Sequence, residues 1–140
     1  MNILVDTGAF YALSDRTDAN HENATSFYAN AVRGNSLVTT DFVLLEAWLL
    51  IRNKLGYFAA QNFWKFMRSG AIQIEYMTAA DLDLAWEIVS MYQDQHFSIA
   101  DATSFAIMER KGIGAAFAFD HHFRVYRFGS RRDMRFTVHP

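Results

Sequence analysis

Short apolar segments alternate with longer segments of helical periodicity along this chain. The strand-like segments are 2–6 (NILVD), 36–40 (SLVTT), 71–77 (AIQIEYM), 115–120 (AAFAFD) and, as an edge strand, 134–140 (MRFTVHP). The helical patterns are 22–34, 41–56, 58–70, 78–95 and 98–112, and Gly34, Gly56, Gly70 and Gly112 are expected to end four of them. Short apolar strands separated by helices are typical of a parallel sheet buried on both faces. The sequence therefore predicts an α/β fold with a mainly parallel central sheet and helices on both sides.

Size and composition favour one globular domain spanning residues 1–140. A length of 140 residues fits a single domain, and the one proline is the last residue, so no linker divides the chain. The absence of cysteine excludes disulfides and thiol nucleophiles. The first residues lack the pattern of a secretion signal. The longest apolar run, 42–51, is too short for a bilayer and contains a glutamate. We therefore expect a cytoplasmic protein that does not enter membranes.

Four acidic residues stand where the pattern predicts a buried environment. Asp6 and Asp120 each end an apolar strand. Glu46 lies in a helix that is apolar nearly all round, and Asp101 lies in the first turn of another helix. A buried charge without a partner is costly or changes its protonation state. Ligands of parallel α/β sheets bind at the carboxyl ends of the strands, where Asp6 and Asp120 are expected.

A divalent cation is the partner that such a group of acids requires. Carboxylates that lie close together repel one another and raise each other's pKa. A cation removes this repulsion, and oxygen ligands without cysteine suit a hard ion such as Mg²⁺ or Mn²⁺. The four acids together therefore predict a metal site.

Each acid also has a purely structural explanation, with one exception. Asp6 and Asp120 can cap the helices that follow their strands, because Asp is a good N-cap residue. Asp101 forms a capping-box pattern with Ser98. Glu46 lies away from any helix end, so capping does not explain it. The joint pattern of all four acids favours a site over a set of caps, and a capping role does not exclude metal binding.

The motifs around these acids resemble those of PIN-domain ribonucleases, and most closely the small toxins of VapBC toxin–antitoxin pairs. The matching segments are DTGAFYAL (6–13), LLEAW (44–48), SIADATSFAIMERKG (98–112) and FAFDHHF (117–123). The resemblance covers essentially the whole chain. It implies a three-layer α/β/α sandwich and a Mg²⁺- or Mn²⁺-dependent endoribonuclease that cleaves single-stranded or exposed RNA. A PIN-like module that binds RNA or protein without catalysis is the alternative.

The resemblance also assigns roles to individual residues. It implies that Asp6, Asp101 and Asp120 hold the metal and that Glu46 supports it directly or through water, so that all four are catalytic. Thr7 and Ser104 match small polar positions near such sites and are candidate substrate contacts.

The charge distribution suggests a second set of substrate contacts. Residues 110–140 hold seven basic side chains against two acidic ones. Such a segment can bind phosphates, and Arg131 and Arg132 are the candidates. A solvated basic surface is the equal alternative.

The sequence also indicates two protein partners, an antitoxin and a second copy of this chain. The resemblance to toxins implies an antitoxin that inserts a basic residue, such as arginine, into the acidic cleft. The surplus of large apolar residues in 42–67 predicts a homodimer face.

The triplet DHH at 120–122 resembles DHH phosphoesterases, but the further motifs of those enzymes are missing. We expect His121 and His122 in the turn after the strand, exposed or in light contact with substrate.

Overall fold

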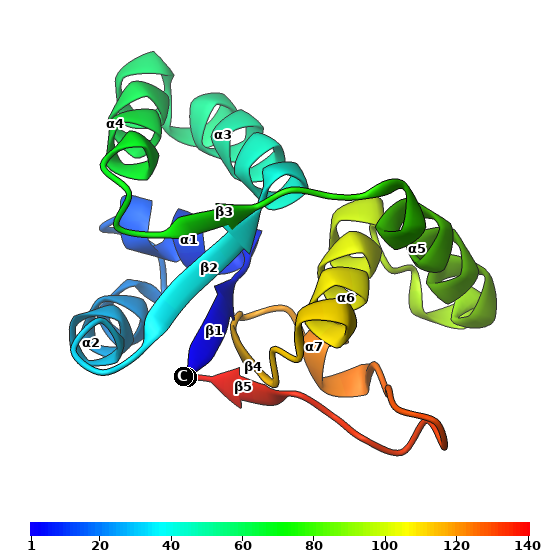
Figure 1. Cartoon of the computed structure of the whole chain (residues 1–140). Helices are drawn as coiled ribbons and strands as arrows, with labels where there is room; N and C mark the ends of the chain where they lie inside the picture. Colours follow the sequence, from blue (N-terminus) through cyan, green and yellow to red (C-terminus); the bar gives the residue numbers. More distant parts are fainter.

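A five-stranded parallel sheet forms the centre of the computed structural model, which describes all residues 1–140 (Figure 1). The strands are β1 (Asn2–Val5), β2 (Ser36–Thr40), β3 (Gln73–Glu75), β4 (Ala115–Phe117) and β5 (Thr137–His139). Their order across the sheet is β3-β2-β1-β4-β5, and every neighbouring pair is parallel. The tail therefore adds the expected edge strand, and the first strand of the chain, β1, lies in the middle of the sheet.

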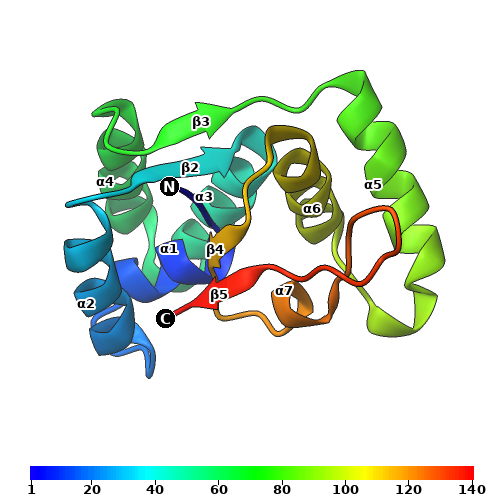
Figure 2. The ribbon, with the colours of Figure 1, turned by 60° about the horizontal axis from the view of Figure 1, so that its bottom comes forward.

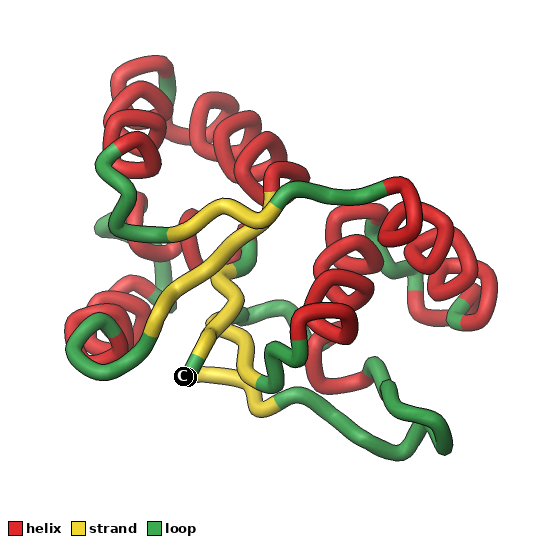
Figure 3. The backbone as a smooth tube through the Cα atoms, in the orientation of Figure 1, coloured by secondary structure: helices red, strands yellow, loops and turns green.

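Helices cover both faces of this sheet (Figures 1 and 2). They are α1 (Thr7–Ser14), α2 (His21–Ala31), α3 (Asp41–Leu55), α4 (Tyr57–Arg68), α5 (Ala79–Met91), the 3₁₀ turn η1 (Gln93–Gln95), α6 (Ile99–Lys111) and α7 (His122–Val125). The first four lie on one side of the sheet, and α5, α6 and α7 lie on the other, with the strands as a thin middle layer (Figure 3). None of the helices combines the length and the apolarity needed to cross a membrane.

The alternation of side chains along β1 builds a separate core on each face. Ile3 and Val5 pack into the cluster formed with the first four helices, and Leu4 packs into the cluster formed with α5, α6 and α7. Successive residues of a strand point to opposite faces, so a strand buried on both sides must be apolar throughout. The predicted three-layer α/β/α fold with a parallel sheet is confirmed.

Helix boundaries follow local capping, with two corrections. The helix expected over 78–95 ends at Met91 and is followed by the separate 3₁₀ turn η1. Thr40 caps α3 by accepting a hydrogen bond of 3.0 Å from the Val43 backbone. The expectation that Gly34 ends the second helix was wrong: α2 ends at Ala31, and Gly34 does not take a positive φ. Instead, the backbone and the side chain of Asn35 both donate hydrogen bonds of 3.1 Å to the Ala31 carbonyl. Asn35 thus satisfies a carbonyl at the helix end, which a glycine in the left-handed conformation often makes possible at other helix ends.

An ion pair between an exposed arginine and a buried aspartate ties α5 to α6. The Arg110 guanidinium donates two hydrogen bonds, of 2.8 and 2.9 Å, to the Asp81 carboxylate, whose side chain is almost fully buried. Burial works to raise the pKa of Asp81, but Arg110 and the backbone of Thr78 together hold it below its usual value. Asp81 also closes the capping box of α5 with Thr78, so one carboxylate serves a helix end and a helix contact.

We expect Arg110→Met to destabilise the protein by about 1–3 kcal/mol, because it leaves a buried carboxylate without its main partner. At this size each kcal/mol lowers Tm by roughly 2–5 °C. Lys111→Met is the matched control, since Lys111 reaches Glu75 only at 3.4 Å and is exposed. Thermal melts of both variants test this, and equal Tm values would show that the Arg110 pair contributes no more than a surface contact.

Candidate active site

The carboxyl edge of the sheet brings the four predicted acids into one cleft. Asp6 follows β1 and Asp120 follows β4, and these strands are neighbours. Glu46 comes from α3 and Asp101 from the first turn of α6. The cleft has a volume of about 300 Å³. Its lining consists of polar residues and one glycine: Asp6, Thr7, Gly8, Glu46, His96, Ser98, Asp101, Asp120 and His122.

Asp6 is the most deeply placed of these acids. Its relative exposure is 3%, and its Oδ1 atom has no hydrogen-bond partner. Burial, and then the charges of Asp101, Glu46 and Asp120, raise the pKa of Asp6 to about 8. Asp6 occupies the N-cap position of α1, yet its side chain makes no capping hydrogen bond. Capping therefore does not explain this residue.

Asp101 has both a structural role and a place in the cleft. It completes the expected capping box with Ser98, whose backbone donates to Asp101 Oδ2 at 3.3 Å. The ring of His122 donates to the same oxygen at 2.9 Å. Burial raises the pKa of Asp101, the His122 hydrogen bond opposes this, and the charge of Asp120 adds to the rise. The cap uses one carboxylate oxygen and leaves the other for the cleft.

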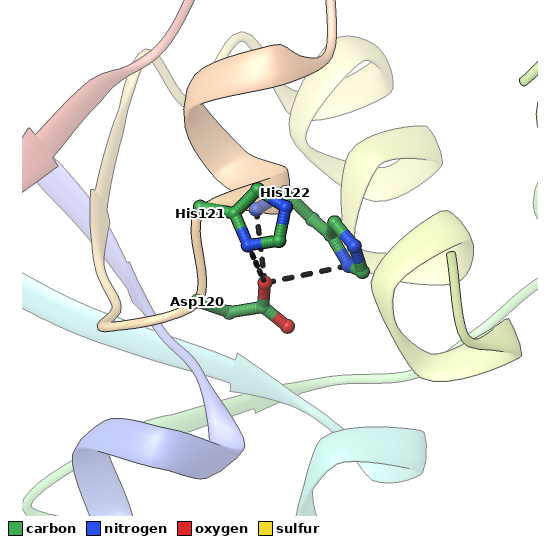
Figure 4. A group of neighbouring side chains, drawn as sticks. All are labelled: Asp120, His121 and His122. Atoms are coloured by element: carbon green, nitrogen blue, oxygen red, sulfur yellow. Dashed lines mark hydrogen bonds and ion pairs between the residues drawn. The ribbon is translucent and has the colours of Figure 1, made fainter. Parts of the chain in front are cut away.

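Asp120 is held by the residue two positions further on. Its Oδ1 accepts a hydrogen bond of 2.9 Å from the backbone N–H of His122, and the ring nitrogens of His122 and His121 lie 3.3 and 3.7 Å from that oxygen (Figure 4). The three residues offer ligand atoms within 4.8 Å of one another. Asp120 therefore also contributes to the start of α7, in the manner of an Asx turn.

The two histidines differ, which corrects the expectation that treated them alike. The His121 side chain is 74% exposed, but the His122 side chain is only 14% exposed and points into the cleft. An Asx turn at Asp120 was the sequence signal that would have placed the His122 backbone next to that carboxylate. His96 was also missed: it lines the cleft with a left-handed φ of 55°, and no sequence pattern marks it.

The candidate substrate contacts fall in two places. Thr7 lines the cleft, Ser104 lies one turn after Asp101 on α6, and the hydroxyl oxygens of both are buried without hydrogen-bond partners. Arg131 and Arg132 are exposed in the turn between Phe128 and Met134, which lies outside the cleft. The structure thus places Thr7 in the cleft, whereas Ser104 and the two arginines are not among the residues that line it.

The donor set fits a hard divalent cation. Buried polar atoms are nearly always satisfied in native structures. Here three oxygens, Asp6 Oδ1, Thr7 Oγ1 and Ser104 Oγ, are buried without a protein partner. Burial first, and then neighbouring carboxylates, raise the pKa of Asp6 and of Asp101, and a cation among these acids would oppose both effects. Clustered carboxylate and hydroxyl oxygens are the ligands that Mg²⁺ and Mn²⁺ prefer.

Comparison with known proteins identifies the family. The PIN domain family matches residues 3–129, so the chain belongs to the PIN-domain proteins. It is 35% identical over 126 residues to the 23S rRNA-specific endonuclease VapC20 of Mycobacterium tuberculosis, covering 90% of this chain and 95% of that protein. It is 28% identical over 140 residues to ribonuclease VapC26 of the same species, covering 99% and 100%. The expected VapC-type family is confirmed.

Solved structures agree with this assignment. The crystal structure of Mycobacterium tuberculosis VapC20, described as a toxin that cleaves the sarcin-ricin loop, matches with a TM-score of 0.82 and 34% identity over 88% of this chain and 93% of that one. VapBC2 from Rickettsia felis, bound to promoter DNA, matches over the full length of both chains with a TM-score of 0.67 and 11% identity. The second likeness concerns the fold alone.

We expect Asp6→Asn to stabilise the metal-free protein, and more so as pH rises. A carboxyl whose pKa is higher in the folded chain than in the unfolded one stabilises the fold below the unfolded pKa, and this contribution is lost as pH rises through the folded pKa. For Asp6 the loss falls between about pH 4 and about pH 8. At pH 8 the Tm of the variant should exceed that of the wild type by roughly 2–5 °C or more. A shift of this size corresponds to about 1 kcal/mol in the free energy of unfolding.

Thermal melts in EDTA at pH 5 and pH 8 make this measurement. Asp83→Asn, which changes an exposed acid of α5 outside the cleft, is the control and should follow the wild type. A gap between Asp6→Asn and the wild type that does not grow with pH would contradict the assignment of repulsion to Asp6.

Proposed function

We propose that this protein is a metal-dependent endoribonuclease that hydrolyses phosphodiester bonds in single-stranded or exposed RNA, as the toxin of a toxin–antitoxin pair. The observation that carries the proposal is the buried Asp6 oxygen that no protein group satisfies, set among three further acids. The named relatives, an endonuclease and a ribonuclease, support the reaction class. A binding module without catalysis is disfavoured, because the Asp6 side chain makes no capping hydrogen bond and so has no structural role that would explain its burial among acids.

The metal is proposed to be Mg²⁺ or Mn²⁺, held by Asp6, Asp101 and Asp120, with Glu46 supporting it directly or through water. When bound, such an ion lowers the pKa of a water molecule and polarises the phosphate. The protein fixes the ligands before the ion arrives: Asp6 is immobilised by burial, and Asp101 by the backbone of Ser98. The hydroxyls of Thr7 and Ser104 are proposed to hold water or substrate oxygens beside the acids.

A second groove supports an RNA strand as the substrate. It has a volume of about 740 Å³ and shares Glu46 with the acid cleft. From Glu46 it extends along α3 past Arg52 and Asn53 to Tyr57, whose ring is more than half exposed. A guanidinium can bind a phosphate, and an exposed aromatic ring can stack on a base. Nucleotides next to the cleaved bond would find both contacts here.

Arg131 and Arg132 remain candidate contacts for RNA further from the cleaved bond. Both are exposed, and neither forms a salt bridge with an acidic side chain. Extended contact of this kind would strengthen binding without touching the reacting phosphate.

Two protein partners are proposed with the nuclease. The strongly acidic cleft suits an antitoxin that inserts a basic side chain between the carboxylates. The exposed apolar side chains of α3 and α4, among them Leu45, Phe58 and Trp64, are the proposed homodimer face. The proposed location is the cytoplasm, where the RNA and an antitoxin would meet the protein.

RNA cleavage should require Mg²⁺ or Mn²⁺ and stop in EDTA. Asp6→Asn and Asp101→Asn should each lower the rate by orders of magnitude, because each removes a proposed ligand. The measurement is cleavage of a mixed RNA pool, with sequencing of the new ends. Asp83→Asn is the control and should cut like the wild type. Undiminished cleavage by Asp6→Asn protein would place the activity in another site or in a contaminating nuclease.

Binding of labelled single-stranded RNA should weaken as salt rises. Replacing Arg131 and Arg132 with Gln should reduce the slope of log affinity against log salt by about 0.7 for each phosphate that the protein no longer neutralises. Fluorescence anisotropy of the Asp6→Asn protein, which leaves the RNA uncut, gives the slope. Arg52→Gln in the groove is the comparison and should also reduce the slope. An unchanged slope after the double replacement would assign Arg131 and Arg132 to a solvated surface.

A further inference from the structure

His122 contacts two of the proposed metal ligands at once. Its Nδ1 lies 2.9 Å from Asp101 Oδ2 and 3.3 Å from Asp120 Oδ1. Its backbone N–H donates to that same Asp120 oxygen at 2.9 Å. One residue therefore joins the start of α6 to the segment that follows β4, and these two segments are far apart in the sequence.

The His122 ring is itself held in place. Its edge packs against Phe97, with 4.9 Å between ring centroids and an interplanar angle of 66°. The next residue, Phe123, is fully buried and packs against Phe105 of α6 at 4.9 Å. These two contacts hold α7 against α6 and the segment that precedes it, so the His122 ring has a fixed position at the cleft. A fixed ring can set the orientation of flexible carboxylates.

The hydrogen bonds of His122 occupy one oxygen of each carboxylate and leave the other free. The occupied oxygens are Asp101 Oδ2 and Asp120 Oδ1. Asp101 Oδ1 and Asp120 Oδ2 accept no hydrogen bond from the protein. Figure 4 shows the second oxygen of Asp120 pointing away from both histidine rings. Together with the unpartnered Asp6 Oδ1, each of the three carboxylates keeps one free oxygen.

We propose that His122 is a positioning residue of the metal site: it orients Asp101 and Asp120 so that one oxygen of each, with Asp6 Oδ1, is presented to the cation. The proposal rests on the metal-dependent function above. Groups that hydrogen-bond to metal ligands typically change metal affinity 10- to 100-fold when they are removed. His121 has no such role, because its ring is exposed and lies 3.7 Å from Asp120, beyond hydrogen-bond distance.

The test uses a pair of substitutions that differ in where they place an N–H donor. The amide nitrogen of Asn occupies the place of histidine Nδ1, whereas that of Gln occupies the place of Nε2. Calorimetric titration of the metal-free full chain with Mn²⁺ gives the affinity. His122→Asn should bind Mn²⁺ within about threefold of the wild type, and His122→Gln should bind roughly 10- to 100-fold more weakly. His121→Asn is the matched control and should leave the affinity unchanged.

Further readouts separate positioning from other roles. At saturating Mn²⁺, the RNA cleavage rate of His122→Gln should return toward the wild-type rate, since the loss lies in metal affinity. His122→Leu, which keeps the contact with Phe97, should bind Mn²⁺ as weakly as His122→Gln and covers the case in which that variant does not fold. Melts in EDTA verify folding.

Three results would overturn the proposal: wild-type affinity in His122→Gln, an equal loss in His122→Asn, or a loss in His121→Asn as large as that in His122→Gln. The last would point to a metal bound by both histidine nitrogens and Asp120 instead. Absence of RNA cleavage by a wild-type protein that binds Mn²⁺ would contradict the proposed function alone.

Discussion

Burial of a carboxylate, Asp6, among three other acids at the carboxyl edge of the sheet is the constraint on which the cleft depends. Asp6 is buried at the end of the central strand with one oxygen unsatisfied, and its pKa is raised to about 8. Such a residue is tolerated only where the rest of the domain supplies stability, here through two apolar cores on either side of β1. The stable sheet thus carries an electrostatically unfavourable site at its edge, and the proposed cation would relieve it.

Most of the fold and the acid cluster could be predicted from the sequence because both follow from short-range patterns. Apolar strands separated by helices determine a parallel sheet, and a parallel sheet gathers its strand ends on one edge. An acid such as Asp6 or Asp120 at a strand end is therefore placed by the strand itself. Glu46 was found by a different signal, a charge within an apolar helix that no cap explains. The family resemblance added the order and spacing of all four.

The positions of Arg131, Arg132 and His122 depend on how the chain continues after β4. Because β5 is parallel to β4, the chain must travel back from the carboxyl edge to the amino edge before Thr137. Arg131 and Arg132 lie on this return path, just after Tyr126, which hydrogen-bonds to Glu109 near the end of α6. Their closeness to Asp120 in sequence therefore does not bring them to the cleft. The buried position of His122 was not expected from the sequence, because it depends on a short helix, α7, which turns the side chain inward beside Asp101.

Capping was a structural explanation for three of the acids on the sequence, and the structure shows a different capping arrangement at each of them. Asp101 caps α6 with the oxygen that also accepts from His122, and its second oxygen stays free. Asp120 uses one oxygen in an Asx turn to the His122 backbone just before α7, whereas the Asp6 side chain makes no capping bond. A carboxylate has enough lone pairs both to accept such a hydrogen bond and to bind a cation. These hydrogen bonds therefore fix the direction of the free oxygen of Asp101 and of Asp120, and a cation in the cleft would meet these two oxygens already oriented.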